Sequence, residues 1–398
     1  MFRAKISQSY LSCGRSKDRR GNILVLSAVV MVAMLGFVAF TVDVGFMTQT
    51  KAQMQTAADG SALAAALEMP QGWGAGKTLT SSQVDSAGRT AAQTVASLHR
   101  VGEQAAAYLD TTRDVRFGQR TKSSQGAWVE SWGVSSYNMV EVTIHRDQAL
   151  AGKTATRADQ QLPLFFAPAM GNNSASLTAK ATAVLSPGDG FSIVPGSGLI
   201  CPVLPIAVDE VTWNNLVNNG VGTDNYRYNP STGAVTSGSD GIKEINIYPT
   251  GTGSPGNRGT VNIGVSNNST AILGRQIQYG LNESDLAMYG GTLRIPAGGT
   301  ITFSGNPGLS AGIKDNLAAI WGQGRAIPIY SSCIGNGNNA VYTITKFVGV
   351  RVMFSQLTGN PSSKQVIIQP AAVFSTTFTS GTGALQPDSI LSALKLIH

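Results

Sequence analysis

The sequence predicts an α+β protein in which a single N-terminal transmembrane helix continues into an exported, pilin-like domain of helices and a sheet, followed by a β-rich α+β domain. Three observations lead to this fold class. Residues 22–42 carry no charge, residues 43–100 are dominated by helical patterns, and apolar and polar residues alternate in many short segments beyond residue 114. Glycine is frequent, at 46 of 398 residues, which favours strands joined by turns over a helical bundle.

The apolar run from Asn22 to Val42 is long enough to cross a membrane. At 1.5 Å per residue, a helix of this length spans roughly 31 Å, against about 30 Å for the hydrocarbon core of a bilayer. A buried helix of a soluble protein is the alternative, but such helices are rarely apolar on every side over so many turns. We therefore expect this segment to span the membrane.

The charges that flank this run predict its direction. Beyond it the nearest basic residue is Lys51, whereas before it only Asp18 opposes six basic residues, which are Arg3, Lys5, Arg15, Lys17, Arg19 and Arg20. This bias places residues 1–21 in the cytoplasm as a basic arm and the rest of the chain outside. A cleaved signal peptide is the alternative, but it needs a shorter apolar stretch and a small-x-small site, and Val38–Val42 offers none. We expect an uncleaved signal anchor.

The remainder of the chain shows little surplus of positive charge. Beyond residue 20, 23 Lys and Arg face 21 Asp and Glu. A protein that binds nucleic acid concentrates basic residues on its folded domain. We therefore expect no nucleic-acid partner and interpret the N-terminal charge as a topology signal beside anionic membrane lipid.

Several motifs in and after the apolar run resemble a known family. They are Arg20-Gly21, Val42-Asp43-Val44-Gly45, Gln53-Met54-Gln55-Thr56-Ala57-Ala58-Asp59 and Ala62-Leu63-Ala64-Ala65-Ala66. Over residues 20–67 the chain resembles the N-terminal module of TadG-like proteins, which belong to the Tad (tight adherence) system that builds Flp-type pili in bacteria. The motif residues are Gly21, Asp43, Gly45 and Asp59. Asp114-Val115-Arg116-Phe117-Gly118, Leu164-Phe165-Phe166-Ala167 and residues 201–373 also look like TadG-related proteins, less specifically.

The resemblance implies a location and partners. A TadG-like protein is a single-pass protein of the bacterial inner membrane, with its bulk in the periplasm, and meets inner-membrane lipid and other Tad or pilus-assembly proteins. Two departures limit what carries over. Leu26 stands where a prepilin has the Glu that follows its cleaved Gly, so we expect no prepilin-type processing. Asp59-Gly60-Ser61-Ala62-Leu63 departs at its last position from the Asp-x-Ser-x-Ser metal motif of longer relatives, so we expect no metal there.

The exported chain divides into two domains. The anchor helix and its extension occupy 22–68, a first α+β domain follows at 69–186, a Gly/Pro-rich linker at 187–198, and a second, β-rich domain at 199–398. In the first domain we expect a helix at 82–100, a strand from 114, strands 127–133 and 139–145 as a pair, a short apolar helix at 162–170 and a strand at 177–185.

The second domain shows alternating strands and short helices. Helices are expected at 210–217 with Asp209 as its cap, at 270–279, at 283–289, and at 310–321 with Ser310 as its cap. Strands are expected at 203–208, 242–248, 260–265, 326–331, 341–355 and 365–374. Antiparallel pairing of 203–208 with 326–331 would place Cys201 opposite Cys333, and an oxidising compartment would then favour a disulfide between them. Two separate buried thiols are the alternative.

No residue pattern points to catalysis, a cofactor or a metal. Gln71–Thr78 nearly matches a phosphate-binding loop but follows a helix, and Gly251–Gly256 fits G-x-G-x-x-G but precedes another strand pattern. No nucleophile elbow is present. His99, His145 and His398 show no ligand spacing. An anchored hydrolase therefore lacks a supporting motif, and we expect no enzyme.

Two function classes remain. The first is a non-enzymatic, membrane-anchored component of a Tad/Flp-type pilus-assembly or secretion apparatus that acts by protein contacts. The alternative is an anchored cell-surface adhesin or glycan-binding protein. For the first class, small residues such as Gly36, Ala39, Ala58 and Ala62 would allow close approach of a neighbouring protein. Asp43 either meets such a neighbour or is an interfacial acid at the membrane boundary.

Overall fold

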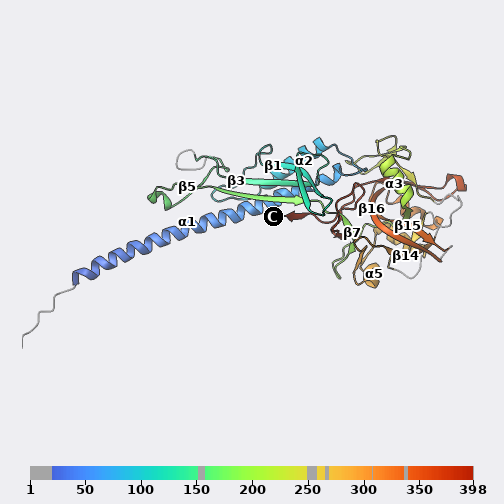
Figure 1. The fold of residues 1–398 in the computed structure, drawn as a ribbon. Coiled ribbons are helices and arrows are strands. Elements are labelled where there is room, and N and C mark those ends of the chain that lie inside the picture. Colours follow the sequence, from blue (N-terminus) through green and yellow to red (C-terminus); the bar gives the residue numbers. More distant parts are fainter. Residues whose placement is uncertain are drawn as a thin grey trace, which may run out of the picture.

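The computed structural model describes residues 20–150, 157–248, 258–264, 269–306, 308–335 and 339–397. Helices and strands are mixed throughout these ranges, which confirms the mixed fold class. Within them one helix, α1 (Arg20–Ala66), is long and apolar enough to cross a membrane, and it continues without a break into its extension. In Figure 1 the N-terminal half of α1 projects from the rest of the molecule, while its C-terminal half lies along a sheet.

The first sheet is antiparallel and has the strand order β19-β6-β3-β1-β2. Its strands are β1 (Val115–Lys122), β2 (Trp128–Trp132), β3 (Met139–Arg146), β6 (Leu177–Val184) and β19 (Lys395–Ile397). The C-terminal half of α1 packs on β6 and β3 and against α2 (Ser81–Ala96), which a short 3-10 helix, η1 (Met69–Gly72), precedes. Thr80 and Gln83 form a capping box at the start of α2, which begins one residue before the expected helix at 82–100 and ends at Ala96.

The first core is built on small side chains of α1. Ala57, Ala58, Ala62, Ala65 and Ala66 are completely buried, as is the larger Met54. They pack with apolar residues of α2 and of the sheet. The close packing has a steric cause, because a Cβ atom on Gly88 of α2 would lie only 3.2 Å from the Ala65 carbonyl oxygen. Small residues on both helices therefore let α2 approach α1 closely.

The expected pairing of 127–133 with 139–145 is corrected. Both strands exist as β2 and β3, but each pairs with β1, which lies between them. Phe117 of β1 is opposite Val140, and Gly118 is opposite Trp132. Alternation of apolar and polar residues marks a strand and its buried face but carries no information on which neighbour it joins.

The segment expected as a helix at 162–170 is instead a hairpin. It begins with β4 (Leu162–Pro163), turns through a short 3-10 helix, η2 (Ala167–Met170), and returns as β5 (Ser174–Ala175), which pairs with β4. Pro168 explains the difference, because a proline inside the expected helix removes an i→i−4 hydrogen bond and clashes with the preceding turn, whereas at the start of η2 it is tolerated. We call residues 162–175 the hairpin below.

The second domain contains a sheet whose strands close into a ring. The order is β11-β17-β16-β14-β12-β8-β15, and β15 also pairs with β16. The strands are β8 (Ile206–Asp209), β11 (Ile245–Asn246), β12 (Arg258–Val261), β14 (Ile301–Asn306), β15 (Gly324–Ile334), β16 (Ala340–Gln356) and β17 (Gln365–Pro370). Alternate residues divide between two cores, for example Ala207 and Phe303 in one, Ile206 and Val208 in the other. The ring therefore consists of β16, β14, β12, β8 and β15, and β17 and β11 continue the sheet outside the ring from β16.

The helices of this domain follow the sequence closely. They are α3 (Glu210–Asn219), α4 (Thr270–Tyr279), α5 (Glu283–Leu286), η3 (Ala287–Tyr289), η4 (Ala311–Ile313) and α6 (Lys314–Ala318), with a further 3-10 turn, η6 (Pro361–Ser363). Asp209 caps α3 by accepting a hydrogen bond from the Thr212 amide at 2.8 Å, and Ser310 caps η4. A small hairpin of β9 (Tyr226–Tyr228) and β10 (Val235–Ser237) forms a separate two-stranded sheet, which packs against β16.

Two expected domain limits are corrected. The linker at 187–198 contains β7 (Gly188–Ser192), which lies between β13 (Thr292–Arg294) and β18 (Phe378–Ser380), and Phe191 is completely buried in the second core. At the other end, residues 395–397 leave the second domain and pair as β19 with residues 182–184 of β6. In Figure 1 the C-terminus accordingly lies beside the first sheet. The pilin-like comparison itself stays a prediction.

Candidate functional site: the joint between the anchor helix and the first domain

Asp43 joins the apolar N-terminal part of α1 to the hairpin. The residue lies directly after the apolar run, yet its side chain is only 3% exposed. Its Oδ1 accepts hydrogen bonds from the backbone amides of Phe165 at 2.8 Å and Phe166 at 3.3 Å. Its Oδ2 accepts from Phe166 at 3.1 Å and from Ala167 at 2.7 Å. The partner that a buried carboxylate requires therefore comes from the same chain, 122 to 124 residues away.

The hairpin packs along one side of α1. The rings of Phe46 and Phe165 have centroids 5.0 Å apart. Higher up the helix, Gln53 accepts a hydrogen bond from the Gly102 amide at 2.8 Å. Gly102 has φ of +61°, and a Cβ atom there would lie 2.9 Å from Leu162 and 3.2 Å from Thr50. The joint is thus a continuous contact from Asp43 to Gln53, and Gly102 meets both a conformational and a steric need.

A buried arginine, which the sequence analysis did not single out, holds the base of the hairpin. Arg146 is completely buried at the end of β3. It donates to the carbonyl oxygens of Gln160 at 2.5 Å and Val101 at 3.2 Å, and pairs with Glu103 at 2.5 Å. A buried guanidinium is costly unless its donors are satisfied, so these bonds fix the chain just before the hairpin. The sequence signal that could have identified Arg146 is its position at the end of a strand in which apolar and polar residues alternate.

Asp59 holds the Gln55 side chain that connects α1 to the sheet. The side chain of Gln55 donates both to Asp59 Oδ1 at 2.9 Å and to the carbonyl oxygen of Lys180 on β6 at 3.0 Å. This shared amide sets the position of the helix along the edge-side strand β6. Among the described residues, no group of three or more His, Cys, Asp or Glu is arranged to hold a metal ion, at Asp59 or elsewhere.

Residues 21–68 match the family model described as putative Flp pilus-assembly TadE/G-like. This segment is TadE/G-like. The match confirms the family resemblance and includes Gly21, Asp43, Gly45 and Asp59. Comparisons with curated proteins and with solved structures gave no match.

The TadE/G-like segment presents two different faces. Asp43, Met54, Ala58 and Ala62 point into the first domain, so the expectation that Ala58 and Ala62 contact a neighbouring protein is corrected. The opposite face carries small, exposed residues, and nothing lies within 4 Å of a Cβ atom built on Gly45. With Gly45, this outer face consists of Thr41, Thr48, Ala52 and Thr56. The three threonine hydroxyls bond to carbonyl oxygens of the helix itself.

The register that suggested a disulfide is wrong. Strands β8 and β15 do pair, but they are parallel, with Val208 opposite Ile329. Because parallel strands run in the same direction, Cys201 precedes the paired segment and Cys333 follows it. Both thiols are free. Burial raises the pKa of the Cys201 thiol to about 11, which leaves this residue an unreactive part of the second core.

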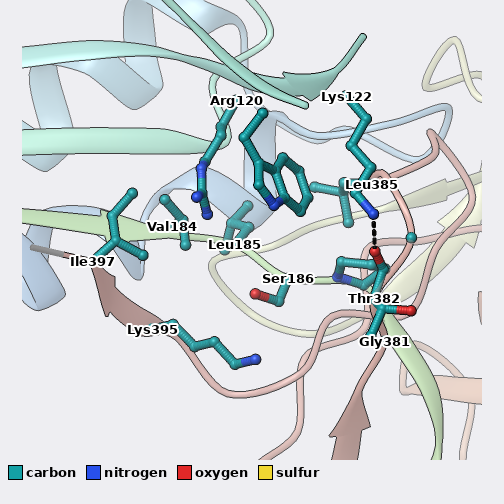
Figure 2. A pocket seen from close by; sticks show the side chains of 13 residues that line it. Arg120, Lys122, Val184, Leu185, Ser186, Gly381, Thr382, Leu385, Lys395 and Ile397 are labelled. Carbon is teal, nitrogen blue, oxygen red and sulfur yellow. Dashed lines mark hydrogen bonds between the residues drawn. The ribbon is translucent and has the colours of Figure 1, made fainter. Parts of the chain in front are cut away.

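A cavity of about 330 Å³ lies where the two domains meet. Figure 2 shows Arg120, Lys122 and Lys395 around it, with Lys122 donating to the Thr382 carbonyl oxygen at 2.6 Å. The guanidinium of Arg120 and the ammonium of Lys122 lie 4.5 Å and 5.0 Å from the ring centroid of Trp128. Arg120 also pairs with Glu130 at 3.7 Å, and Lys395 lines the cavity without a recorded contact to the ring. A cavity with three basic groups and one aromatic ring suits a small anionic ligand with an apolar face.

The first of the two phosphate-loop-like sequences does not form such a loop. Residues 69–72 form η1 directly after α1, so no strand precedes Gln71–Thr78. The G-x-G-x-x-G sequence at 251–256 lies outside the described residues.

Proposed function

We propose that this chain is a non-enzymatic, membrane-anchored component of a Tad/Flp-type pilus-assembly or secretion apparatus and acts through protein contacts. The match of residues 21–68 to the Flp pilus-assembly model carries this proposal. Residues 23–38 of α1 are all exposed, as an apolar helix surrounded by lipid would be. The flanking charges favour a cytoplasmic N-terminus and a periplasmic first and second domain.

The contact surface that fits this role is the outer face of α1. The opposite side of the helix is occupied by the chain's own first domain. The outer face has no large side chain at its centre, and its hydroxyl groups are already hydrogen-bonded within the helix. Small residues of this kind let a second helix approach closely, in and just above the membrane.

Substitution of Gly45 tests this assignment in the bacterium that encodes the chain. Gly45→Leu adds bulk at an exposed position and should lower co-purification of pilus-assembly proteins roughly tenfold, the effect of about 1.4 kcal/mol. Gly45→Ala gains similar helix propensity without that bulk and should assemble normally. Surface pili or secreted product provide the functional readout. Equal co-purification and equal output from both variants would remove the outer face as the contact surface.

The cavity between the domains favours a second candidate, binding of an acidic glycan by an anchored adhesin. Trp128 offers a surface for a sugar ring, and the neighbouring basic groups offer partners for its carboxylate. Calorimetry with N-acetylneuraminic acid and with galactose as the neutral control tests it. Binding of the acidic sugar that is lost in Trp128→Ala supports the adhesin, and equal heats for both sugars contradict it.

A further inference from the structure

The tip of the hairpin exposes large apolar side chains. Phe165 is 63% exposed, Phe166 49% and Met170 84%. No charged residue occurs between Gln160 and Ala179. An exposed apolar patch without any charge indicates a surface that something apolar covers.

The hairpin points along α1 toward the apolar run. Its base lies at the level of Thr50, because Leu162 and Thr50 both border Gly102. Its turn lies at the level of Asp43, which is seven residues and about 10 Å closer to the N-terminus of the helix. Figure 1 shows β5 beside the point at which α1 leaves the first domain. The exposed apolar side chains therefore continue the apolar surface of residues 23–42.

Contact with the helix reaches into the apolar run itself. Ala39, one turn before Asp43, is half-buried, whereas Val38 and Phe40 are exposed. The 3-10 helix η2 contacts α1. Ala39, Asp43 and Phe46 share one side of the helix, so the turn of the hairpin lies against the last turn of the expected membrane span.

The backbone amides of the turn have hydrogen-bond acceptors within the protein, so they do not depend on water. The amides of Phe165, Phe166 and Ala167 donate to Asp43. Those of Leu164, Ala169, Gly171 and Asn172 donate to carbonyl oxygens of the hairpin, and Pro168 has no N–H. Unsatisfied backbone donors are what exclude most loops from lipid. In this turn Asp43 accepts hydrogen bonds from the amides that would otherwise be unsatisfied in lipid, and its own carboxylate is buried by the same contacts.

We propose that residues 165–170 insert into the outer-leaflet side of the membrane, beside α1, as a second point of lipid contact. The inference rests on the proposed membrane insertion of α1. A single helix leaves the exported domains free to rotate about its axis and to tilt. A second lipid contact, attached to the same helix through Asp43, restricts both motions and sets which way the outer face of α1 is directed. A depth in the region between headgroups and acyl chains, about 5–10 Å, fits a turn of this kind.

Depth-dependent fluorescence quenching of the full-length protein in lipid nanodiscs tests this proposal. An NBD label is attached through Met170→Cys and, as a matched control, through Met288→Cys, an exposed methionine of the second domain. A third label at Val32→Cys reports on the membrane span. The background carries Cys13→Ser and Cys333→Ser, and Cys201 is completely buried and stays unlabelled.

The expected result is a blue-shifted emission at 170, a loss of iodide quenching relative to 288, and strongest quenching by lipids with a nitroxide near the headgroup. Water-like emission at 170 with a lipid-buried label at 32 would overturn the hairpin inference and leave the anchor intact. Water-like emission at both positions would overturn the inference together with the anchor. Protection of 170 from iodide without quenching by nitroxide lipid would assign the patch to a protein, such as a second copy, and so also contradict insertion.

Discussion

Removal of the Asp43 carboxylate should release the hairpin from α1 without unfolding the first domain. The carboxylate accepts from three consecutive amides, with its shortest bonds at 2.7 Å and 2.8 Å. A hydrogen bond to a charged group contributes roughly 1.5–3 kcal/mol. Because the three amides share one acceptor, and water can replace part of the loss, we expect Asp43→Ala to cost about 3 kcal/mol locally. The main core, built on residues 54–66, does not include Asp43.

Hydrogen exchange measured by mass spectrometry reads this change directly. A loss of about 3 kcal/mol corresponds to roughly 10²-fold faster exchange at the amides of residues 165–167, if they exchange by local opening. Exchange in β3 and β6 should stay at the wild-type rate. Asp59→Asn is the matched control, since Asp59 lies on the same helix and bonds only to Gln55 among the side chains described. Unchanged exchange at 165–167 in Asp43→Ala would refute the assigned role of Asp43.

Three further outcomes follow from burial, pKa and charge. Ala58→Leu inserts bulk into a completely buried position and should destabilise the detergent-solubilised protein by about 1–3 kcal/mol, seen as a lower thermal midpoint; an unchanged midpoint would place Ala58 on the surface. Because burial raises the pKa of Cys201 from 9.0 to about 11, its contribution to stability is complete below pH 9 and is lost as the pH rises from about 9 to about 11. Cys201→Ala should therefore flatten that part of the curve of unfolding free energy against pH, and identical slopes would argue against a buried neutral thiol. A periplasmic reporter fused after residue 75 should be active and one fused at residue 15 inactive, and the reverse would overturn the orientation.

Local features were predictable because their causes are local. The apolar run, the Asp209 cap of α3 and the Ser310 cap of η4 depend on residues within a few positions of one another. The helix expected at 270–279 has the same bounds in the structure. Each of these elements carries its own start signal, and tertiary packing did not change it.

Contacts between segments far apart in the chain were not predictable, because one sequence pattern is compatible with several strand pairings and packing partners. Period-two alternation marked both β8 and β15 but could not tell a parallel from an antiparallel pair, and the disulfide expectation failed on that choice. The return of Lys395–Ile397 to β6 depends on an open sheet edge at residues 182–184, far earlier in the chain, and a segment of three residues carries no pattern that predicts this pairing. Ala58 and Ala62 were expected to contact a neighbouring protein but are buried by the chain's own first domain, because composition does not distinguish that domain from a partner. Asp43 was recognised as a motif residue, while its acceptor role required the fold.

The most direct test of the account is to identify what lies against the outer face of α1 in living cells. A photo-crosslinking amino acid at Thr48, which is exposed on that face, is activated in the native bacterium, and the adducts are identified by mass spectrometry. The same photo-crosslinking amino acid, placed at Leu98 of the first domain, serves as the control, because Leu98 is 77% exposed. The account predicts that Thr48 adducts contain pilus-assembly proteins of the same system and exceed those at Leu98. Adducts at Thr48 that lack any such protein would contradict it.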